Sequence, residues 1–466
     1  MRSTIRTAGA LVVATLSLTG AMVAASRAGG RDGLPAALTF SNAAGTLGTL
    51  TAGGRFDEAN PFFAELGTNG RTCGSCHRPA QAWSITPAEV AERFERTAGL
   101  DPIFRTNDGS NCEGADVSTL DQRRRAYSAL LNKGVIRVGL EVPVEAEFEI
   151  VAVDDPYRCG MAASSASMYR RPLPTANLSF LSAVMWDGRA SRPGHAIADD
   201  LLAQAVDATL QHAEGVAPPA AQLRDVVDFE LGVVAAQMRD HGAGSLSAAG
   251  ARGGTSLLGR QPFCIGINDP LGMRPAMPGA CLARSAGLDP VVFTLFAPWR
   301  DASSPERQAI ARGEALFNTR RFVIDAVPGL NGVPGDPVSG PIASGTCTVC
   351  HDTPNAGNHS VAMALNIGIA DESRRTPDLP LYTLRNRVTG EVVRTTDPGR
   401  AMVTGAWRDI GKFKGPILRA LAARPPYFHD GSAASLADVI AFYDTRFHIR
   451  FTEREKADLL AFLRAL

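Results

Sequence analysis

Cys73-Gly74-Ser75-Cys76-His77 and Cys347-Thr348-Val349-Cys350-His351 share one pattern, Cys-x-x-Cys-His. Two cysteines at this spacing can each form a thioether bond with one vinyl group of a haem, and the adjacent histidine can ligate the iron. A zinc site needs four ligands, and no second Cys pair or Cys–His pair lies close to either motif to complete one. A thioredoxin-like redox site does not require the histidine. The sequence therefore predicts two covalently bound c-type haems.

Composition supports a loop-rich globular chain built around cofactors. The chain has 466 residues with a formal net charge of zero, 46 glycines and 30 prolines, and few aromatic residues. This length is ample for two or three domains. Neither a basic run nor a charge excess is present, so we expect no nucleic-acid partner.

The N-terminus has the features of a secretory signal. Arg2 and Arg6 precede an apolar run, Ala8 to Ala25, which small residues follow. We predict a signal peptide over residues 1–28 and hence a periplasmic or secreted protein. A membrane anchor is the alternative, but the run is short for a span and lacks a stop-transfer flank. No membrane span is expected after cleavage of the signal.

Four cysteines lie outside the two motifs: Cys112, Cys159, Cys264 and Cys281. An even remainder in an exported chain predicts two disulfides. Three pairings exist, and the sequence does not choose between them. We favour Cys112–Cys159 and Cys264–Cys281, because both are local.

Hydrophobic periodicity predicts a mainly α fold with long loops and one small β-hairpin insertion. The hairpin is expected from the β-branched runs at 135–138 and 148–153. Helix starts with capping residues occur at Thr86, Ser304 and Thr452, and a capping box is expected with Glu89 and with Glu455. Further helices are predicted over 197–211 and 219–239, and a long covering loop over 241–290.

We expect two haem domains after the signal peptide. The N-terminal one spans residues 29–298 and contains insertions. The C-terminal one spans 299–466 and begins, as small cytochrome c domains do, with a helix that ends before its Cys-x-x-Cys-His motif.

Two more strings occur in a distinctive order relative to the two Cys-x-x-Cys-His motifs. They are Met185-Trp186-Asp187-Gly188-Arg189 and Pro426-Tyr427-Phe428-His429-Asp430-Gly431-Ser432. With these four strings the chain, over roughly residues 60 to 466, resembles the di-haem cytochrome c peroxidase family, which includes the methylamine-utilisation enzyme MauG. The segments 100–170 and 215–300 depart from the compact members. The resemblance implies two cytochrome c-like haem domains, with peroxide reacting at the N-terminal haem and the C-terminal haem passing electrons to it.

Trp186 matches the tryptophan that lies between the haems in that family, so the resemblance makes it the electron bridge. An indole is oxidisable, which agrees with this role; a Trp buried as core is the alternative. No histidine occurs between His77 and His195 that could be the sixth ligand of the iron at the N-terminal haem. We therefore expect that iron to be five-coordinate and open, as in MauG.

The family's catalytic glutamate follows a Gln-Ala pair. Gln204-Ala205 matches the pair, and Glu214 matches the glutamate, although residues are inserted between Arg189 and Gln204. The resemblance implies that Glu214 moves a proton between the peroxide oxygens. His212 is the neighbouring alternative for this step, and a solvated helix end is the alternative for both residues.

On the C-terminal haem the resemblance implies Tyr443 as sixth iron ligand, as the matching tyrosine is in MauG. His448, His359 and Met402 are the alternatives. The family also implies Ca2+ between the domains, held by backbone carbonyls such as those of Arg424 and Pro426 and by an Asn. This chain has Arg171 at the Asn position, and its charge argues against calcium.

The resemblance implies an exported peroxidase-type oxidoreductase. It would use H2O2 at the open haem and draw electrons from a small redox protein, such as a cytochrome c or a cupredoxin. One alternative is a MauG-like or rubber-oxygenase-like enzyme that oxidises a protein side chain or an organic substrate. The other is a di-haem cytochrome that only transfers electrons, which would require two six-coordinate irons.

Overall fold

The computed structural model describes residues 38–52, 54, 56–261, 266–268, 289–334, 340–358 and 364–466. They belong to one compact unit, Ala36–Leu466. The signal peptide and the Cys264–Cys281 pair fall outside the described residues and stay predictions.

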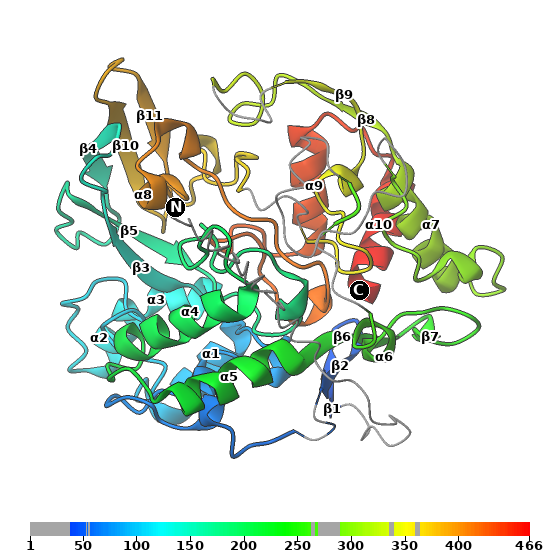
Figure 1. The fold of residues 1–466 in the computed structure, drawn as a ribbon, viewed down its shortest axis with the longest axis horizontal. Helices are drawn as coiled ribbons and strands as arrows, with labels where there is room; N and C mark the ends of the chain where they lie inside the picture. Colours follow the sequence, from blue (N-terminus) through cyan, green and yellow to red (C-terminus); the bar gives the residue numbers. More distant parts are fainter. Residues whose placement is uncertain are drawn as a thin grey trace, which may run out of the picture. The chain divides into compact units, whose positions relative to one another are not determined.

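Helices occur along the whole described chain (Figure 1). They are α1 (Pro87–Thr97), α2 (Leu120–Ala126), α3 (Ser128–Lys133), α4 (Ile197–Gln211), α5 (Ala220–Gly232), α6 (Thr255–Leu258), α7 (Pro305–Thr319), α8 (Ala401–Thr404), α9 (Leu436–Arg446) and α10 (Glu453–Ala465). In Figure 1, α1 to α5 lie on one side and α7, α9 and α10 on the other.

The strands form small antiparallel sheets within the described residues. One sheet has the order β1 (Leu38–Asn42), β2 (Gly45–Thr51), β6 (Val233–Asp240), β7 (Gly244–Ser245). Another has the order β11 (Val392–Thr395), β10 (Leu381–Asn386), β4 (Phe148–Asp154). The remaining pairs are β3 (Ile136–Glu141) with β5 (Ser165–Arg170), and β8 (Phe322–Ile324) with β9 (Ile342–Gly345).

The fold is therefore mixed, and the expectation of a mainly α chain with one hairpin is too narrow. Strands do form at 136–141 and 148–154, but they do not pair with each other. The residues between them lack the two-residue turn that a hairpin favours. Glu147 instead donates its N–H to the Gly405 carbonyl at 2.8 Å, which directs Phe148 towards β10.

The helix expected over 219–239 is also shorter than predicted. It ends at Gly232, and the chain continues as β6. β-Branched residues favour extended structure, and Val233 and Val234 pair with Thr51 and Leu50 of β2. The strand thus brings the C-terminal end of α5 to the sheet.

The cap predictions at Thr86 and Thr452 are confirmed. The Thr86 hydroxyl accepts from the Glu89 N–H, and Thr452 forms a capping box with Glu455. The Glu89 carboxylate does not complete the expected box, because it accepts from Arg78 at 2.8 Å instead.

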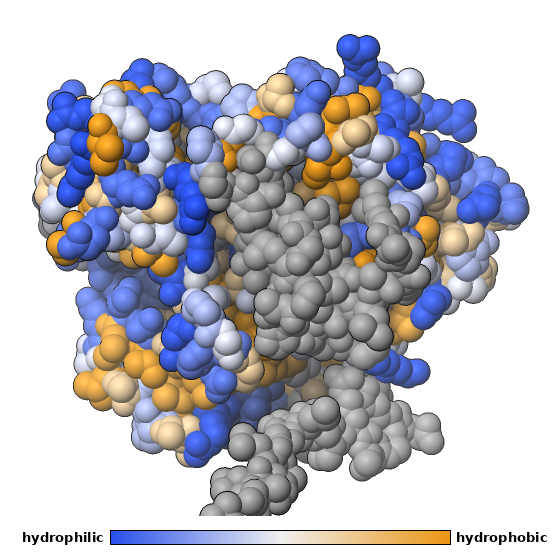
Figure 2. Space-filling model, turned by 45° about the horizontal axis from the view of Figure 1, so that its top comes forward, coloured by the Kyte–Doolittle hydropathy of each residue, from blue (hydrophilic) through white to orange (hydrophobic). Residues whose placement is uncertain are grey.

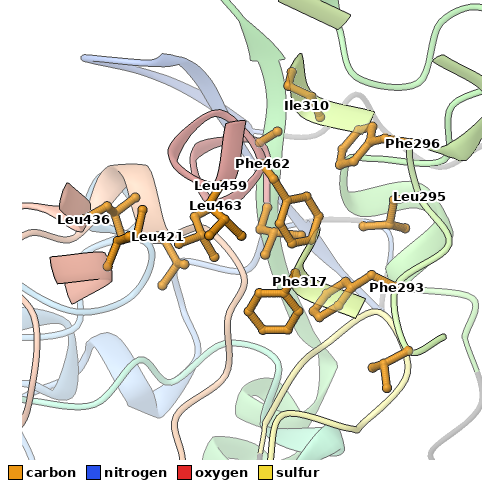
Figure 3. Packing of buried hydrophobic residues seen from close by; sticks show 14 of the residues in the cluster. Phe293, Leu295, Phe296, Ile310, Phe317, Leu421, Leu436, Leu459, Phe462 and Leu463 are labelled. Carbon is orange, nitrogen blue, oxygen red and sulfur yellow. The ribbon is translucent and has the colours of Figure 1, made fainter. Parts of the chain in front are cut away.

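The largest buried cluster joins α7, α9 and α10 to the segment before α7. Figure 3 shows Phe462 of α10 pointing toward Phe293 and Phe317, with ring centroids 5.3 Å and 5.7 Å away. The contact with Phe293 is edge-to-face and the one with Phe317 is tilted, and both help to fix the helices that surround the second Cys-x-x-Cys-His motif.

On the face shown in Figure 2, hydrophilic side chains are interspersed with smaller hydrophobic patches. Among the described residues, no helix has the length and apolar character needed to cross a bilayer.

Cys112 and Cys159 form a disulfide, which confirms that predicted pair. It links the loop before α2 to the loop between β4 and β5 and spans 47 residues of sequence. A loop of this length restricts the unfolded chain, so replacing both cysteines with serine should lower the free energy of unfolding by about 4 kcal/mol.

Guanidinium unfolding of the mature protein measures this loss. A thiol reductant should lower the midpoint of the parent to that of the double variant and leave the variant unchanged. Equal midpoints for the untreated parent and the variant would show that the disulfide contributes no stability.

Candidate functional site

The first Cys-x-x-Cys-His motif forms a tight 3-10 turn over Cys73–Ser75. The N–H of His77 closes it by donating to the Cys73 carbonyl at 3.0 Å. Glycine is required at the second position, because a Cβ there would lie 2.9 Å from the Phe63 ring. The turn places Cys73, Cys76 and His77 along one cavity.

The second motif repeats this geometry. Its 3-10 turn covers Cys347–Val349, and the His351 N–H donates to the Cys347 carbonyl at 3.1 Å. Cys347, Cys350 and His351 line a second cavity. The two cavities have nearly equal volumes, about 190 Å³ and 210 Å³, and mostly apolar linings.

Both motif histidines are held in the orientation that a metal ligand needs. The Nδ1 atom of His77 lies 3.0 Å from the Trp83 carbonyl, and that of His351 lies 2.8 Å from the Gly357 carbonyl. A carbonyl only accepts, so Nδ1 carries the proton and Nε2 keeps its lone pair. Burial lowers the pKa of His77 to about 4 and lowers the pKa of His351, which favours the neutral imidazole.

None of the four motif cysteines forms a disulfide within the described part of the chain. Burial raises the pKa of Cys73, Cys347 and Cys350 to about 12 and also raises the pKa of Cys76. A redox Cys-x-x-Cys depends on a lowered thiol pKa, so these sites do not fit that chemistry. Nor do the described residues contain a group of three or more His, Cys, Asp or Glu side chains that could hold a metal ion such as zinc.

The two cavities adjoin at one wall. The residues that line both are Arg171, Pro172, Pro174, Trp186, Lys414 and Pro416. The Trp186 indole N–H donates to the Arg171 carbonyl at 2.8 Å, and the Lys414 backbone N–H donates to the Trp186 carbonyl at 2.8 Å. Trp186 is 9% exposed, so these bonds fix a nearly buried indole between the cavities.

This wall carries positive charge without a matching acid. Arg171 and Lys414 line both cavities and Arg424 lines the second; none of them has an ion pair within the described part of the chain. Burial lowers the pKa of Arg171 to about 9, of Lys414 to about 8 and of Arg424 to about 10, and Arg424 adds repulsion at the other two. Buried cations are costly unless an anion faces them.

These features fit a haem in each cavity. A haem combines an apolar ring, two vinyl groups that react with thiols, an iron that binds imidazole, and two carboxylates. The apolar linings, the paired thiols and the oriented histidines match the first three. Lys414 and, in the second cavity, Arg424 match the carboxylates, which arginine and lysine bind by charge-assisted hydrogen bonds.

Gln204 and His212, two of the residues that the resemblance suggested for catalysis, both line the first cavity. The Nδ1 atom of His212 is hydrogen-bonded to Asp108, whose carboxylate also pairs with Arg71. Burial opposes ionisation of Asp108, but the hydrogen bond from His212 and the charge of Arg71 outweigh it and lower the pKa of Asp108. An ionised Asp108 orients the imidazole, which leaves Nε2 to exchange a proton.

Glu214, by contrast, is exposed just beyond the end of α4 and is not among the residues that line the first cavity. The carboxylate that does line it is Glu230 of α5, which is 5% exposed. Its Oε2 has no hydrogen-bond partner, and burial raises the pKa of Glu230 to about 8. We did not predict this residue. Its position one helical turn after Val226 and Val227, on the buried face of α5, is the signal that could have found it.

Tyr443 lines the second cavity with His351, and the two rings are 6.4 Å apart. Burial raises the pKa of Tyr443. Of the alternative ligands, His448 is exposed and Met402 is buried in a separate cluster. His359 lies outside the described residues.

Buried charges join the Trp-Asp-Gly-Arg string to distant parts of the chain. Arg170 binds Asp187 through Nη1 at 2.5 Å and Asp397 through Nε and Nη2 at 2.7 Å and 2.8 Å. His429 of the second string is fully buried, stacks on Phe413 at 4.1 Å and lies 6.4 Å from the Trp186 ring. The two strings therefore meet around the shared wall.

The residues present do not fit a Ca2+ ion at the place that the resemblance implied. The Arg424 carbonyl, which would be one ligand, accepts a hydrogen bond from the Arg171 guanidinium at 3.3 Å. Two cations cannot share that site.

No protein-family model matches the chain. Its sequence is similar to the cytochrome c peroxidases IdrP1 of Denitromonas iodatirespirans, at 31% identity over 140 residues, and of Pseudomonas sp. strain SCT, at 29% over 140 residues. Each match covers 26% of this chain, which spans only 36% of the length of these relatives. The fold is similar to the crystal structure of a MauG-like protein associated with microbial copper homeostasis, with a TM-score of 0.37 and 15% identity over 87% of this chain and 86% of that chain.

The sequence matches cover a limited part of the chain, but they confirm the resemblance that the motifs indicated. The chain is a distant homologue of the di-haem cytochrome c peroxidases.

Proposed function

We propose that this chain is an exported di-haem oxidoreductase that reduces H2O2 in its first cavity and receives the electrons through its second. The observation that carries the proposal is the shared wall, because Trp186 lines both cavities that contain a Cys-x-x-Cys-His motif. A chain with two independent haem sites would not need such a wall.

In this proposal Cys73 and Cys76 would hold the first haem through thioether bonds, and His77 would ligate its iron. Cys347 and Cys350 would hold the second haem in the same way, and His351 would ligate its iron. When bound, each haem supplies a redox-active iron whose reactivity depends on whether its sixth position is open. The domains would be residues 29–298 and 299–466, in the periplasm or outside the cell after removal of residues 1–28.

We assign proton transfer in the first cavity to His212 and Glu230 rather than to Glu214. His212 is oriented by Asp108, so its Nε2 can take a proton from a bound substrate and return it as a general base and acid. Glu230 holds a proton at neutral pH, because burial raises the pKa of this carboxyl to about 8. Gln204, which lines the same cavity, can orient the substrate by hydrogen bonds.

Trp186 is the proposed electron path between the cavities. Its indole is held by the Arg171 carbonyl and lies edge-on to His429, so it is fixed in one position. The proposed electron donor is a small redox protein, a cytochrome c or a cupredoxin.

A second candidate is oxidation of a protein side chain or an organic molecule, as in MauG-like or rubber-oxygenase-like enzymes. Tyr443 favours this second candidate. It lines the second cavity with His351, so its phenolate would be the sixth ligand of the second iron and would stabilise the oxidised states of that iron.

The first prediction tests the electron path. Trp186→Phe fills nearly the same space but is much harder to oxidise, so the rate of H2O2 reduction by a reduced donor should fall at least about tenfold, a loss of about 1.4 kcal/mol of barrier lowering. Stopped-flow kinetics on the mature protein measure this rate. Trp407→Phe is the matched control, because Trp407 lines neither cavity. An unchanged rate in Trp186→Phe would remove this residue from the path.

The second prediction concerns the sixth ligand in the second cavity. Electron paramagnetic resonance of the ferric parent should show one high-spin and one low-spin haem. Tyr443→Phe should convert the low-spin signal to high-spin while the haem content stays at two, because Cys347, Cys350 and His351 still hold the cofactor. His448→Gln is the control and should leave both signals intact. A low-spin signal that survives in Tyr443→Phe would assign the ligand to another residue.

The third prediction concerns Glu230. Its folded-state pKa is raised from 4.5 to about 8, so the unfolded chain loses this proton first as pH rises, and stability falls between these values. Glu230→Gln removes this loss, so thermal unfolding should show the variant gaining stability over the parent from pH 5 to pH 8. The exposed Glu214→Gln controls for removing one carboxylate. A constant difference between Glu230→Gln and the parent across that range would contradict the assignment.

A further inference from the structure

The side chain of Arg171 occupies a site made of backbone oxygens. Its Nη1 donates to the Lys133 carbonyl at 2.8 Å, and its Nη2 donates to the Ile85 carbonyl at 2.6 Å and to the Arg424 carbonyl at 3.3 Å. No carboxylate forms an ion pair with it within the described residues, and the side chain is buried. Three carbonyl dipoles thus surround one positive charge.

The three carbonyls come from separate parts of the fold. Ile85 precedes α1, Lys133 ends α3, and Arg424 precedes the Phe-His-Asp-Gly string. Gly134, which has a φ of +61°, leaves the space that the guanidinium fills, because a Cβ there would lie 2.8 Å from Arg171 Nη1. The absence of a side chain at Gly134 therefore leaves room for a group as large as a guanidinium.

The backbone of the same residue connects the site to the wall between the cavities. The Arg171 carbonyl accepts from the Trp186 indole at 2.8 Å, and its N–H donates to the His429 carbonyl at 2.6 Å. The backbone of Arg171 therefore helps to hold Trp186 in its position between the cavities.

We propose that the Arg171 guanidinium is a built-in cation that takes the place of a divalent metal ion, so that the wall is held together without a metal. Backbone carbonyl oxygens are among the ligands that Ca2+ prefers, and here three of them accept hydrogen bonds from Nη1 and Nη2 of a fixed organic cation instead. The inference concerns the fold of this wall and does not depend on which substrate the cavities take.

It follows that removing the guanidinium should create a metal site. In Arg171→Asn the three carbonyls lose their donor, and the shorter side chain adds an amide oxygen and leaves room for a hydrated ion. Ca2+ can complete its coordination there with the four oxygens and water. In Arg171→Met the side chain fills the same space with apolar atoms and adds no oxygen, so this variant controls for loss of the arginine alone.

The experiment compares the mature parent, Arg171→Asn and Arg171→Met by thermal unfolding with excess EDTA or with millimolar CaCl2. It also measures 45Ca binding by equilibrium dialysis. The parent should have the same Tm in EDTA and in CaCl2 and bind no Ca2+ at this concentration. Both variants should have a lower Tm in EDTA, but only Arg171→Asn should bind one Ca2+ and regain part of the lost Tm in CaCl2.

Two results would overturn the proposal. A parent whose Tm falls in EDTA and recovers in CaCl2 would show that a metal is still needed, and this result requires no variant to fold. An Arg171→Asn protein that folds but neither binds Ca2+ nor gains Tm in CaCl2 would show that the three carbonyls do not form a cation site. The haem content and peroxide turnover of the parent decide the proposed function separately, so the two proposals can fail independently.

Discussion

The structure depends on how the positive charges buried in the wall between the two cavities are paired with oxygen atoms. Arg171, Lys414 and Arg424 are buried there without acid partners in the described chain. Carbonyl oxygens accept hydrogen bonds from the guanidinium of Arg171, whereas burial and the charge of Arg424 lower the pKa of Lys414 to about 8. If carboxylates of two haems contacted this wall, one haem from each side, they would pair with the buried cations. The pairing would offset the desolvation penalty of those cations.

The same wall explains why distant segments converge. Arg170 bridges Asp187 and Asp397, so the strand β5 and the Trp-Asp-Gly-Arg loop are tied to the segment after β11. Buried charges of this kind cost little only when every charge has its partner, and here Arg170 pairs with both carboxylates while Arg189 also pairs with Asp187. These ion pairs, together with the hydrogen bond from the indole to the Arg171 carbonyl, hold Trp186 at the wall that both cavities share.

Residues whose role is set by local chemistry were predictable from the sequence. The turns at Cys73 and Cys347 follow from the Cys-x-x-Cys-His pattern, and the caps at Thr86 and Thr452 follow from their hydroxyls. Roles that depend on tertiary pairing were not. The β4 strand pairs with β10, more than 200 residues later, which no local pattern encodes.

The carboxylate that lines the first cavity shows the same limit. The resemblance implied Glu214 through its offset from Gln204; Glu214 lies exposed beyond α4, and Glu230 of the next helix lines the cavity. An offset along the chain does not determine which helix face meets a cavity. The buried positions of Val226 and Val227 would have been the better guide.

A crystal structure of the mature protein, with anomalous scattering measured at the iron edge, would show whether two haems meet at one positively charged wall. We expect two iron peaks, one bonded to His77 Nε2 and one to His351 Nε2, with carboxylates of the haems turned toward Lys414 and Arg424. A single iron, or two haems whose carboxylates point away from this wall into solvent, would contradict this expectation.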